Sequence, residues 1–416
     1  MLEISKIMEI AGNEATPAYI FDMDELSARM SDIQQILGAD VNLCYAMKAN
    51  PFLVHAMKKL AAKFEVCSPG EFSICEREKV DMSTVVLSGV NKEKHDVEHV
   101  MDDCGGVGVY TVESLSQFSL LEECATARQL KIDVLLRVTS GNQFGLDEAD
   151  IEELVKNRAE YEYINIRGVQ CYSGTQKKNT EIIAKELEWL DGFCDSLNEK
   201  HGFKAQELEY GPGLPVSYFG ADAHNNNYDM LKEFAAELDK LRGKYEITLE
   251  MGRFLASTCG VYVSEVADTK VNKGQNYCVI DGGINHINYF GQTMAMKVPA
   301  YTFVKADGTV AAGIDMVKKA PVLEAGAAEN LDKWTIVGSL CTVADVIVKN
   351  LPIGTPEVGD KIIFYNIGAY SVTEGIYLFL SRRMPKIIAY SEKEGVSVYR
   401  DFRYSDEINS RDELFN

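Results

Sequence analysis

The sequence lacks C-x-x-C cysteine pairs and long apolar runs. Its ten cysteines are scattered, so neither a zinc knuckle nor a compact disulfide framework is expected, and no metal site is predicted. No apolar run approaches the ~18 residues that suggest a membrane span. The amino-terminal MLEISKIMEIAG carries acidic residues where a signal peptide would carry a basic patch. These absences predict a cytoplasmic protein.

The sequence also has fewer basic than acidic residues. Lys and Arg number 42 against 63 Asp and Glu, which gives a formal charge of -21. Such a chain repels phosphate backbones and anionic lipid headgroups, so nucleic acid and membrane surfaces are poor partners. The glycine-rich run GGVGVY at 105–110 matches neither a nucleotide P-loop nor the G-x-G-x-x-G fingerprint. A small molecule or another protein is the expected partner.

The remaining composition is that of a globular protein with a large core, at 46% hydrophobic and 25% charged residues. Short β-branched runs alternate with helical segments over the first 250 residues, which predicts a parallel sheet. Eight such units predict a (β/α)₈ barrel, and an open doubly wound sheet is the alternative. The predicted strands are 41–47, 64–68, 85–89, 107–111, 134–138, 166–171, 207–211 and 246–251.

After about residue 254 the pattern changes to strands without long helices between them. GVYVSEVADTKVNKGQNYCVIDGG predicts a hairpin that turns at Lys273-Gly274. The Ala- and Gly-rich stretch 303–330 is expected to be irregular. A second, mostly β domain is therefore predicted.

Active-site residues of such barrels lie on the loops that follow the strands. Lys48 follows the first predicted strand; it is either a surface charge or, enclosed beside apolar walls, an amine of lowered proton affinity suited to imine formation. Gly211-Pro212-Gly213 and Arg253 together make a plausible phosphate cradle. Glu250 is either a partner for a cofactor's pyridine nitrogen or a strand-end ion pair with Arg253.

Seven ordered motifs extend over nearly the whole chain: YAMKAN, FEVCSPGEF, CYSGTQ, EYGPGLP, EMGRFLA, VGSLCTVAD and NIGAYS. This set resembles the pyridoxal-phosphate decarboxylases typified by diaminopimelate and ornithine decarboxylases. The resemblance implies an alanine racemase-like (β/α)₈ barrel over 22–253. It also implies a β domain built from 1–21 and 254–416, with PAYIFD (17–22) as its amino-terminal strand.

By motif position, the resemblance implies a role for each matching residue. Lys48 would hold pyridoxal 5′-phosphate as an imine, Glu250 would face the pyridine nitrogen, and Cys341 would reach the active site of the neighbouring subunit of a homodimer. After decarboxylation, Cys341 is the candidate acid that protonates Cα. The remaining expected cofactor contacts are Arg137, Tyr172, Thr175, Gly211, Gly213, Gly252, Arg253 and Tyr370, and the expected substrate contacts are His286, Tyr289, Thr342 and Asp345.

The chain departs from the family pattern at three places. Tyr172 stands where the family usually has a histidine stacked on the cofactor ring, and a tyrosine can still stack. Thr342 follows Cys341 where diaminopimelate decarboxylases have a glutamate for the distal ammonium. An Arg-Pro pair that clamps the distal carboxylate is missing. Free diaminopimelate therefore fits poorly, because a buried carboxylate without its arginine is costly.

Several local strings, among them NQFGLDE and GVYVSEV, resemble the specialised-metabolism branch of the family, which includes a butirosin-pathway decarboxylase of a carrier-bound glutamyl group. The substrate stays open between diaminopimelate, ornithine, lysine, a citryl-linked diamino acid and a carrier-bound amino acid. Two other functions are alternatives: an amino-acid racemase on the same fold and a catalytically inactive binding protein. Glu250 argues against a racemase, because racemases of this fold place an arginine beside the pyridine nitrogen.

Overall fold

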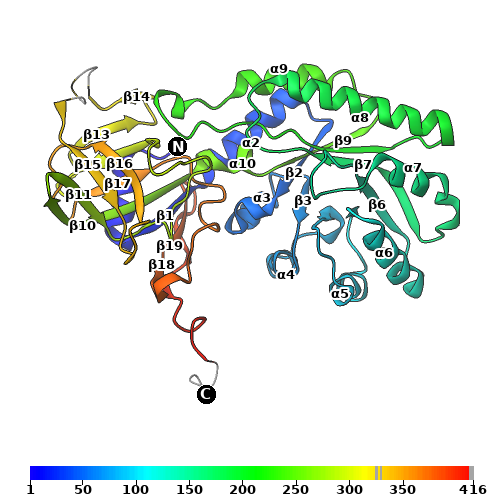
Figure 1. Cartoon of the computed structure of the whole chain (residues 1–416), viewed down its shortest axis with the longest axis horizontal. Coiled ribbons are helices and arrows are strands. Elements are labelled where there is room, and N and C mark those ends of the chain that lie inside the picture. The colour runs from blue at the N-terminus through cyan, green and yellow to red at the C-terminus, as the bar shows by residue number, and fades with distance from the viewer. Residues whose placement is uncertain (324–326, 328–329, 412–416) are drawn as a thin grey trace. The chain divides into compact units, whose positions relative to one another are not determined.

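A computed structural model describes residues 1–323, 327 and 330–411 (Figure 1). The chain divides into two compact units. The barrel unit comprises Arg29–Pro215 and Asn227–Leu255, and the β unit comprises Met1–Ala28, Val216–Asn226 and Ala256–Asn416. Helices α2 (Met23–Leu37) and α10 (Arg253–Ala256) contain residues at which the chain passes from one unit to the other.

The barrel unit is a closed parallel barrel in which the last strand pairs with the first. All eight predicted strands are present, which confirms the (β/α)₈ prediction and excludes the open sheet. Its strands are β2 (Val41–Ala46), β3 (Lys63–Val66), β4 (Val85–Leu87), β5 (Val109–Val112), β6 (Ile132–Arg137), β7 (Ile164–Tyr172), β8 (Glu207–Gly211) and β9 (Glu246–Met251).

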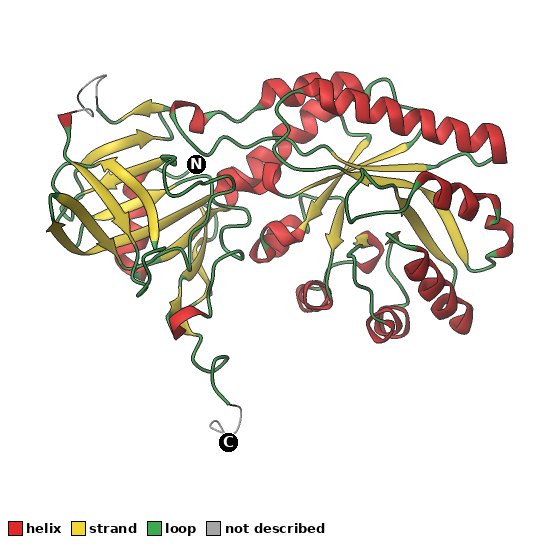
Figure 2. Cartoon of the chain, in the orientation of Figure 1, coloured by secondary structure: helices red, strands yellow, loops and turns green. Residues whose placement is uncertain are grey.

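Helices surround these strands (Figure 2). Each buries one apolar stripe; in α8, for example, Ile183, Leu187, Leu190 and Cys194 recur at three- and four-residue spacing and are all buried. Seven helices lie wholly within this unit, counted over the described residues: α3 (Val54–Met57), α4 (Pro69–Glu78), α5 (Lys94–Cys104), α6 (Leu115–Arg128), α7 (Glu148–Lys156), α8 (Thr180–His201) and α9 (Tyr228–Leu238).

The β unit is built on a mixed sheet in which β1 (Ala18–Asp22) lies between β10 (Gly260–Asn272) and β19 (Lys386–Ser391). The amino-terminal strand therefore joins the β unit, as the family resemblance implied. The other strands of the unit are β11 (Gln275–Ile280), β12 (Tyr301–Val304), β13 (Val310–Asp315), β14 (Ala320–Pro321), β15 (Lys333–Val337), β16 (Val346–Pro352), β17 (Lys361–Phe364), β18 (Arg383–Met384), β20 (Gly395–Arg400) and β21 (Arg403–Tyr404).

The predicted hairpin is confirmed. Asn272 of β10 pairs with Gln275 of β11, so the connection consists of Lys273 and Gly274 alone. Both residues have positive φ, 50° and 79°, as a two-residue turn between twisted strands requires.

Two features of the β unit differ from the sequence analysis. The prediction that 303–330 is irregular is wrong for its first part, because β12 continues through Phe303 and Val304, and β13 then pairs back along β12 after a turn at Gly308. Residues 324–326 and 328–329 of that stretch lie outside the described residues. Helix α1 (Ile4–Glu14) was not predicted; its Ile7, Ile10 and Ala11 pack into the core of the unit. Among the described helices, none is long and apolar enough to cross a membrane.

Candidate active site

Lys48 lies in a short 3₁₀ turn, Met47–Ala49, directly after β2. The hydroxyl of Tyr45 donates to the carbonyl of Asn50 at 2.9 Å, and the side chain of Asn50 accepts from the amide of Phe52 at 3.1 Å. Pro51 then favours the extended conformation observed at Asn50. These contacts fix the backbone around Lys48, so the sequence itself positions its side chain at the carboxyl end of the barrel.

Two carboxylates face the amine of Lys48. Its Nζ forms an ion pair with Glu65 from β3 and lies 3.1 Å from Oε1 of Glu250 from β9. The sulfur of Cys67 lies 3.8 Å away. Lys48 is thus neither a lone surface charge nor an amine among apolar side chains alone, because inward positions of the neighbouring strands carry acids at this level of the barrel.

The two acids differ in their affinity for a proton. Burial, then the charge of Glu65, raises the pKa of Glu250 to about 7 despite the opposing effect of Lys48. Burial also opposes ionisation of Glu65, but the Lys48 ammonium and hydrogen bonds outweigh it and lower the pKa of that carboxyl. The surroundings therefore favour the ionised form of Glu65 more than that of Glu250, although both carboxyls contact the same amine.

Tyr172 ends β7, and its ring lies against Gly211 at the end of β8. A Cβ added at Gly211 would lie 2.4 Å from Cδ2 of Tyr172, so only glycine leaves room for the ring there. Burial, then the charge of Glu250, raises the pKa of the Tyr172 hydroxyl. The side chain thus stays neutral and offers a flat face of the kind that stacks on an aromatic cofactor.

A backbone cradle follows the same two strands. Gly213 has φ +63°, and a Cβ there would approach the carbonyl oxygen of Gly174 to 2.0 Å. A Cβ on Gly174 would meet nothing within 4 Å, so this surface beside Thr175 is open. Arg253, 8% exposed, begins α10 just after β9. The arrangement fits the predicted phosphate cradle.

Arg137 ends β6, and Gly252 directly follows β9. A Cβ on Gly252 would come within 2.7 Å of the Cβ of Ala49, so glycine here permits close approach of the backbone to the turn of Lys48. The guanidinium of Arg137 pairs with Glu113 at 3.0 Å and lies over the ring of Phe144. A cofactor contact by Arg137 stays a prediction, since these two neighbours already engage its guanidinium.

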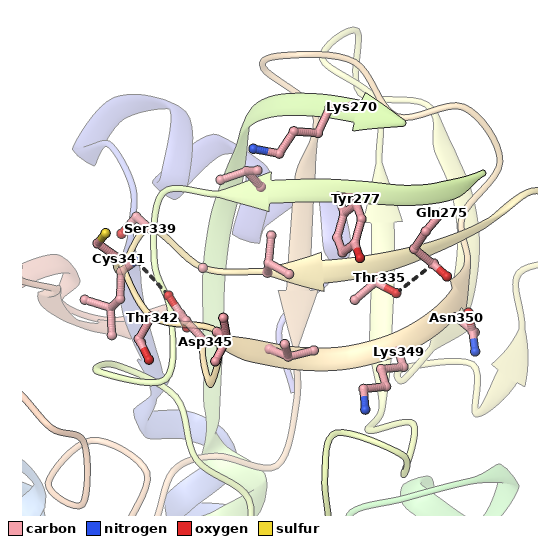
Figure 3. A pocket seen from close by; sticks show the side chains of 16 residues that line it. Lys270, Gln275, Tyr277, Thr335, Ser339, Cys341, Thr342, Asp345, Lys349 and Asn350 are labelled. Atoms are coloured by element: carbon pink, nitrogen blue, oxygen red, sulfur yellow. Dashed lines mark hydrogen bonds between the residues drawn. The ribbon is translucent and has the colours of Figure 1, made fainter. Parts of the chain in front are cut away.

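The β unit places Cys341 on the rim of a groove of about 630 Å³ (Figure 3). Cys341 is exposed, and Val343 is 100% exposed. The buried carboxylate of Asp345 accepts from the amides of Ile284 and Leu340 at 2.8 and 2.7 Å. Asp345 therefore shapes the loop that presents Cys341 and Thr342, and both residues line the groove.

Three further predicted residues also lie in the β unit. His286 is buried, its Nδ1 lies 3.1 Å from the hydroxyl of Tyr262, and its Nε2 lies 3.0 Å from the carbonyl of Arg383. The hydroxyl of Tyr289 donates to the carbonyl of Tyr365 at 2.8 Å. These bonds give His286 and Tyr289 structural roles, and their substrate contacts stay predictions. Tyr370 has φ +65° and follows Ala369 in the NIGAYS motif.

The sequence analysis missed the polar residues that support the site from inside the barrel. Glu65, Glu113, Gln170 and Glu209 were not singled out. The available signal was an acid or amide at an inward, alternating position of an otherwise apolar strand, two residues before a motif residue. The pattern was present, for example, at Gln170 before Tyr172 and at Glu209 before Gly211.

The residues of the barrel mouth fit pyridoxal phosphate. They supply an amine within contact of an acid, a neutral aromatic ring, and an open glycine-lined cradle next to a buried arginine. This set matches the aldehyde, the pyridine nitrogen, the ring and the phosphate of that group.

Comparison with known proteins identifies the family of the chain. Residues 23–257 match the family model described as "Pyridoxal-dependent decarboxylase, pyridoxal binding domain". The chain is 23% identical to an L-glutamyl-[BtrI acyl-carrier protein] decarboxylase of Niallia circulans, over 92% of this chain and 91% of that protein. It is 25% identical to a 2-[(L-alanin-3-ylcarbamoyl)methyl]-2-hydroxybutanedioate decarboxylase of Staphylococcus aureus, over 89% and 93% of the two chains.

Among solved structures, the chain resembles a diaminopimelate decarboxylase of Methanocaldococcus jannaschii in complex with L-lysine. The TM-score is 0.80 at 23% identity, and the match covers 97% of this chain and 93% of that one. This likeness shows that both chains share the barrel-plus-β fold.

Proposed function

The chain belongs to the pyridoxal-dependent decarboxylases, and we propose that it removes the α-carboxylate of an amino-acid derivative with Lys48 as the residue that holds pyridoxal phosphate. The contact between Lys48 Nζ and Glu250, 3.1 Å apart at the mouth of a closed barrel, carries this proposal. It brings together an amine for the aldehyde of the cofactor and a carboxyl for its pyridine nitrogen.

The bound cofactor supplies an aromatic ring that withdraws electrons from the substrate's Cα. Glu250 holds a proton at the pyridine nitrogen, and Gln170 fixes that carboxylate by donating to its Oε2 at 2.9 Å. Tyr172 would cover one face of the ring, and the Gly213 turn with Thr175, Gly252 and Arg253 would receive the phosphate. Glu65 stabilises the Lys48 ammonium whenever the amine is released from the cofactor.

We propose that Cys341 donates the proton that replaces the carboxylate on Cα, and that it does so in the partner subunit of a homodimer. Support comes from its exposure next to the fully exposed Val343, on a loop held in shape by Asp345. Tyr370 is proposed to contact the phosphate from the β unit.

The substrate is proposed to be an amino acid whose distal end is masked rather than a free diaminopimelate. The support is chemical: Thr342 cannot pair with a distal ammonium as a glutamate would, and the clamp for a distal carboxylate is missing. Relatives that act on a carrier-bound glutamyl group and on a citryl-linked amino acid are consistent with this class. The cytoplasmic location stays a prediction from the sequence.

Release of carbon dioxide from a panel of amino acids tests the activity, with Lys48→Ala as the blank. The panel comprises diaminopimelate, ornithine, lysine, a citryl-linked diamino acid and a carrier-bound glutamyl group. We expect release from a masked substrate and none from the variant. Loss of chirality without gas would indicate a racemase instead, and absence of any cofactor absorbance would indicate a binding protein.

Borohydride reduction and peptide mapping test the assignment of Lys48. Lys92 is the matched control, because it is another half-buried lysine of the barrel unit, and burial lowers its pKa to about 8. We expect the pyridoxyl label on Lys48 in the unaltered chain and in Lys92→Ala. A label on Lys92 would contradict the assignment.

A further inference from the structure

Glu209 lies inside the barrel with no apparent use. Along β8, Tyr210 points outward, where its hydroxyl bonds to Glu186 of α8, so Glu209 on the alternate face points inward. Glu209 is 0% exposed. Neither carboxyl oxygen has a hydrogen-bond partner among the described residues. Burying an acid without hydrogen-bond partners lowers stability, so its presence here calls for an explanation.

Gln170 is the neighbour of Glu209 on the next strand. The two are register partners of β7 and β8, so their side chains leave the same face of strands that lie ~4.8 Å apart. The Gln170 Nε2 donates to Glu250, whereas its Oε1 is buried and has no partner in the described part of the chain. The unused acceptor of Gln170 and the unused carboxyl of Glu209 therefore belong to paired residues on the same face of adjacent strands.

The surroundings favour the uncharged acid. Burial, followed by the charges of Glu250 and Glu207, raises the pKa of Glu209 well above its ordinary value. Glu65 acts in the same direction, and Lys63 opposes it. Lys63, however, is already bound to Glu207 and Thr248 below. A neutral carboxyl has an O–H group that can donate a hydrogen bond. Oε1 of Gln170 is an acceptor that has no donor among the described residues.

We propose that Glu209 is a permanently protonated carboxylic acid that donates to Oε1 of Gln170 and thereby holds the amide of Gln170 toward Glu250. Glu209 is thus a positioning residue for the acid that faces the cofactor. No proton leaves Glu209 in this role. The inference rests on the proposed function, because Glu250 matters here as the partner of the pyridine nitrogen.

Glu209 can orient Gln170 because the oxygen and the NH₂ of an amide have similar shapes and exchange places by rotation. Without a donor on its Oε1 side, Gln170 can rotate and present that oxygen to Glu250, where it repels the carboxylate instead of binding it. A protonated Glu209 makes one orientation the favourable one. Glu250 then keeps a fixed donor on Oε2 and leaves Oε1 available toward the barrel mouth.

Three variants separate the role of the O–H from that of charge or bulk. Glu209→Gln keeps a donor and removes the ability to ionise, Glu209→Leu removes the donor, and Gln170→Leu removes the residue through which it acts. We expect Glu209→Gln to bind pyridoxal phosphate as the unaltered chain does. We expect Glu209→Leu and Gln170→Leu each to weaken binding about tenfold, and the double variant to be no weaker than either one.

Unaltered affinity in Glu209→Leu would overturn the proposal, as would equal losses in Glu209→Gln and Glu209→Leu. Thermal melting of the cofactor-free variants shows whether each is folded. A second measurement needs no cofactor: the infrared carbonyl band of a protonated carboxylic acid, present in the unaltered protein at pH 8 and absent in Glu209→Gln. Absence of the band refutes a neutral Glu209, whereas failure of Lys48 labelling refutes the proposed function and leaves the band unchanged.

Discussion

Three glutamates inside one barrel carry different charges because of what each contacts. Glu65 meets the Lys48 ammonium and is ionised, Glu250 shares that ammonium and holds its proton more tightly, and Glu209 meets no cation directly. Environment, and not residue type, therefore decides which of them is an anion, an exchangeable acid or a hydrogen-bond donor.

His286 provides a test of a structural role against a substrate role. Burial, together with Arg382 and Arg400, lowers the pKa of His286 to about 4 from its ordinary value of 6.5. Between these two pH values the unfolded chain binds a proton that the folded chain does not, so the folded state loses stability as the pH falls through this window. We expect chemical unfolding at pH 7 and 4.5 to show about 2 kcal/mol less acid destabilisation in His286→Gln than in the unaltered protein.

The exposed His95 supplies the control for this experiment. His95→Gln controls for the loss of a histidine as such, because the side chain of His95 is 74% exposed. Equal pH dependence in His286→Gln and the unaltered protein would argue that His286 is accessible to protons, as a substrate contact would be.

Cys341 is tested by the fate of the product. We expect Cys341→Ala to bind pyridoxal phosphate normally, because Cys341 is not among the residues proposed to hold the cofactor. Turnover should fall by about 10²–10⁴, the usual contribution of a general acid, or yield misprotonated products. Cys104→Ala at the end of α5 is the matched control. Unchanged rate and products in Cys341→Ala, measured by product analysis in deuterated water, would refute the proton-donor role.

At the scale of elements, the sequence predicts the strands well but not the side-chain contacts inside the barrel. The eight barrel strands are recognisable from β-branched runs, because burial on both faces selects for those residues. The contact of Lys48 with Glu250 joins positions 202 residues apart in the sequence, so no local pattern reveals it. Helix α1 was missed because it precedes the βα repeat and its apolar stripe is short.

Two glycines with nearly equal φ separate the cost of strain from the cost of blocking the cradle. Gly213 has φ +63°, and a Cβ there would collide with the carbonyl of Gly174. Gly202, at the end of α8, has φ +62°, and a Cβ there would meet no atom within 4 Å. Gly202→Ala should cost about 1 kcal/mol of stability and leave cofactor binding intact. Gly213→Ala should cost more and weaken pyridoxal phosphate binding, measured by absorbance titration. Equal affinity in both variants would show that the Gly213 turn does not receive the phosphate.

At the scale of the whole molecule, residues of both compact units carry proposed roles. Lys48 and Glu250 belong to the barrel unit, and Cys341 and Tyr370 belong to the β unit. The family resemblance implies that the cysteine serves the neighbouring subunit. Catalysis would then depend on association of two chains, and a closed two-fold dimer would contain two equivalent composite sites.

Complementation between two inactive variants tests this directly. A mixed dimer of Lys48→Ala and Cys341→Ala chains has one site that lacks both residues and one site that has both. Random mixing of equal amounts makes half of the dimers mixed, so about a quarter of the original sites are restored. We expect carbon dioxide release to recover to about that fraction after the chains are unfolded and refolded together. If each site uses its own Cys341, every site in the mixture lacks one residue, and activity stays at the level of the separate variants.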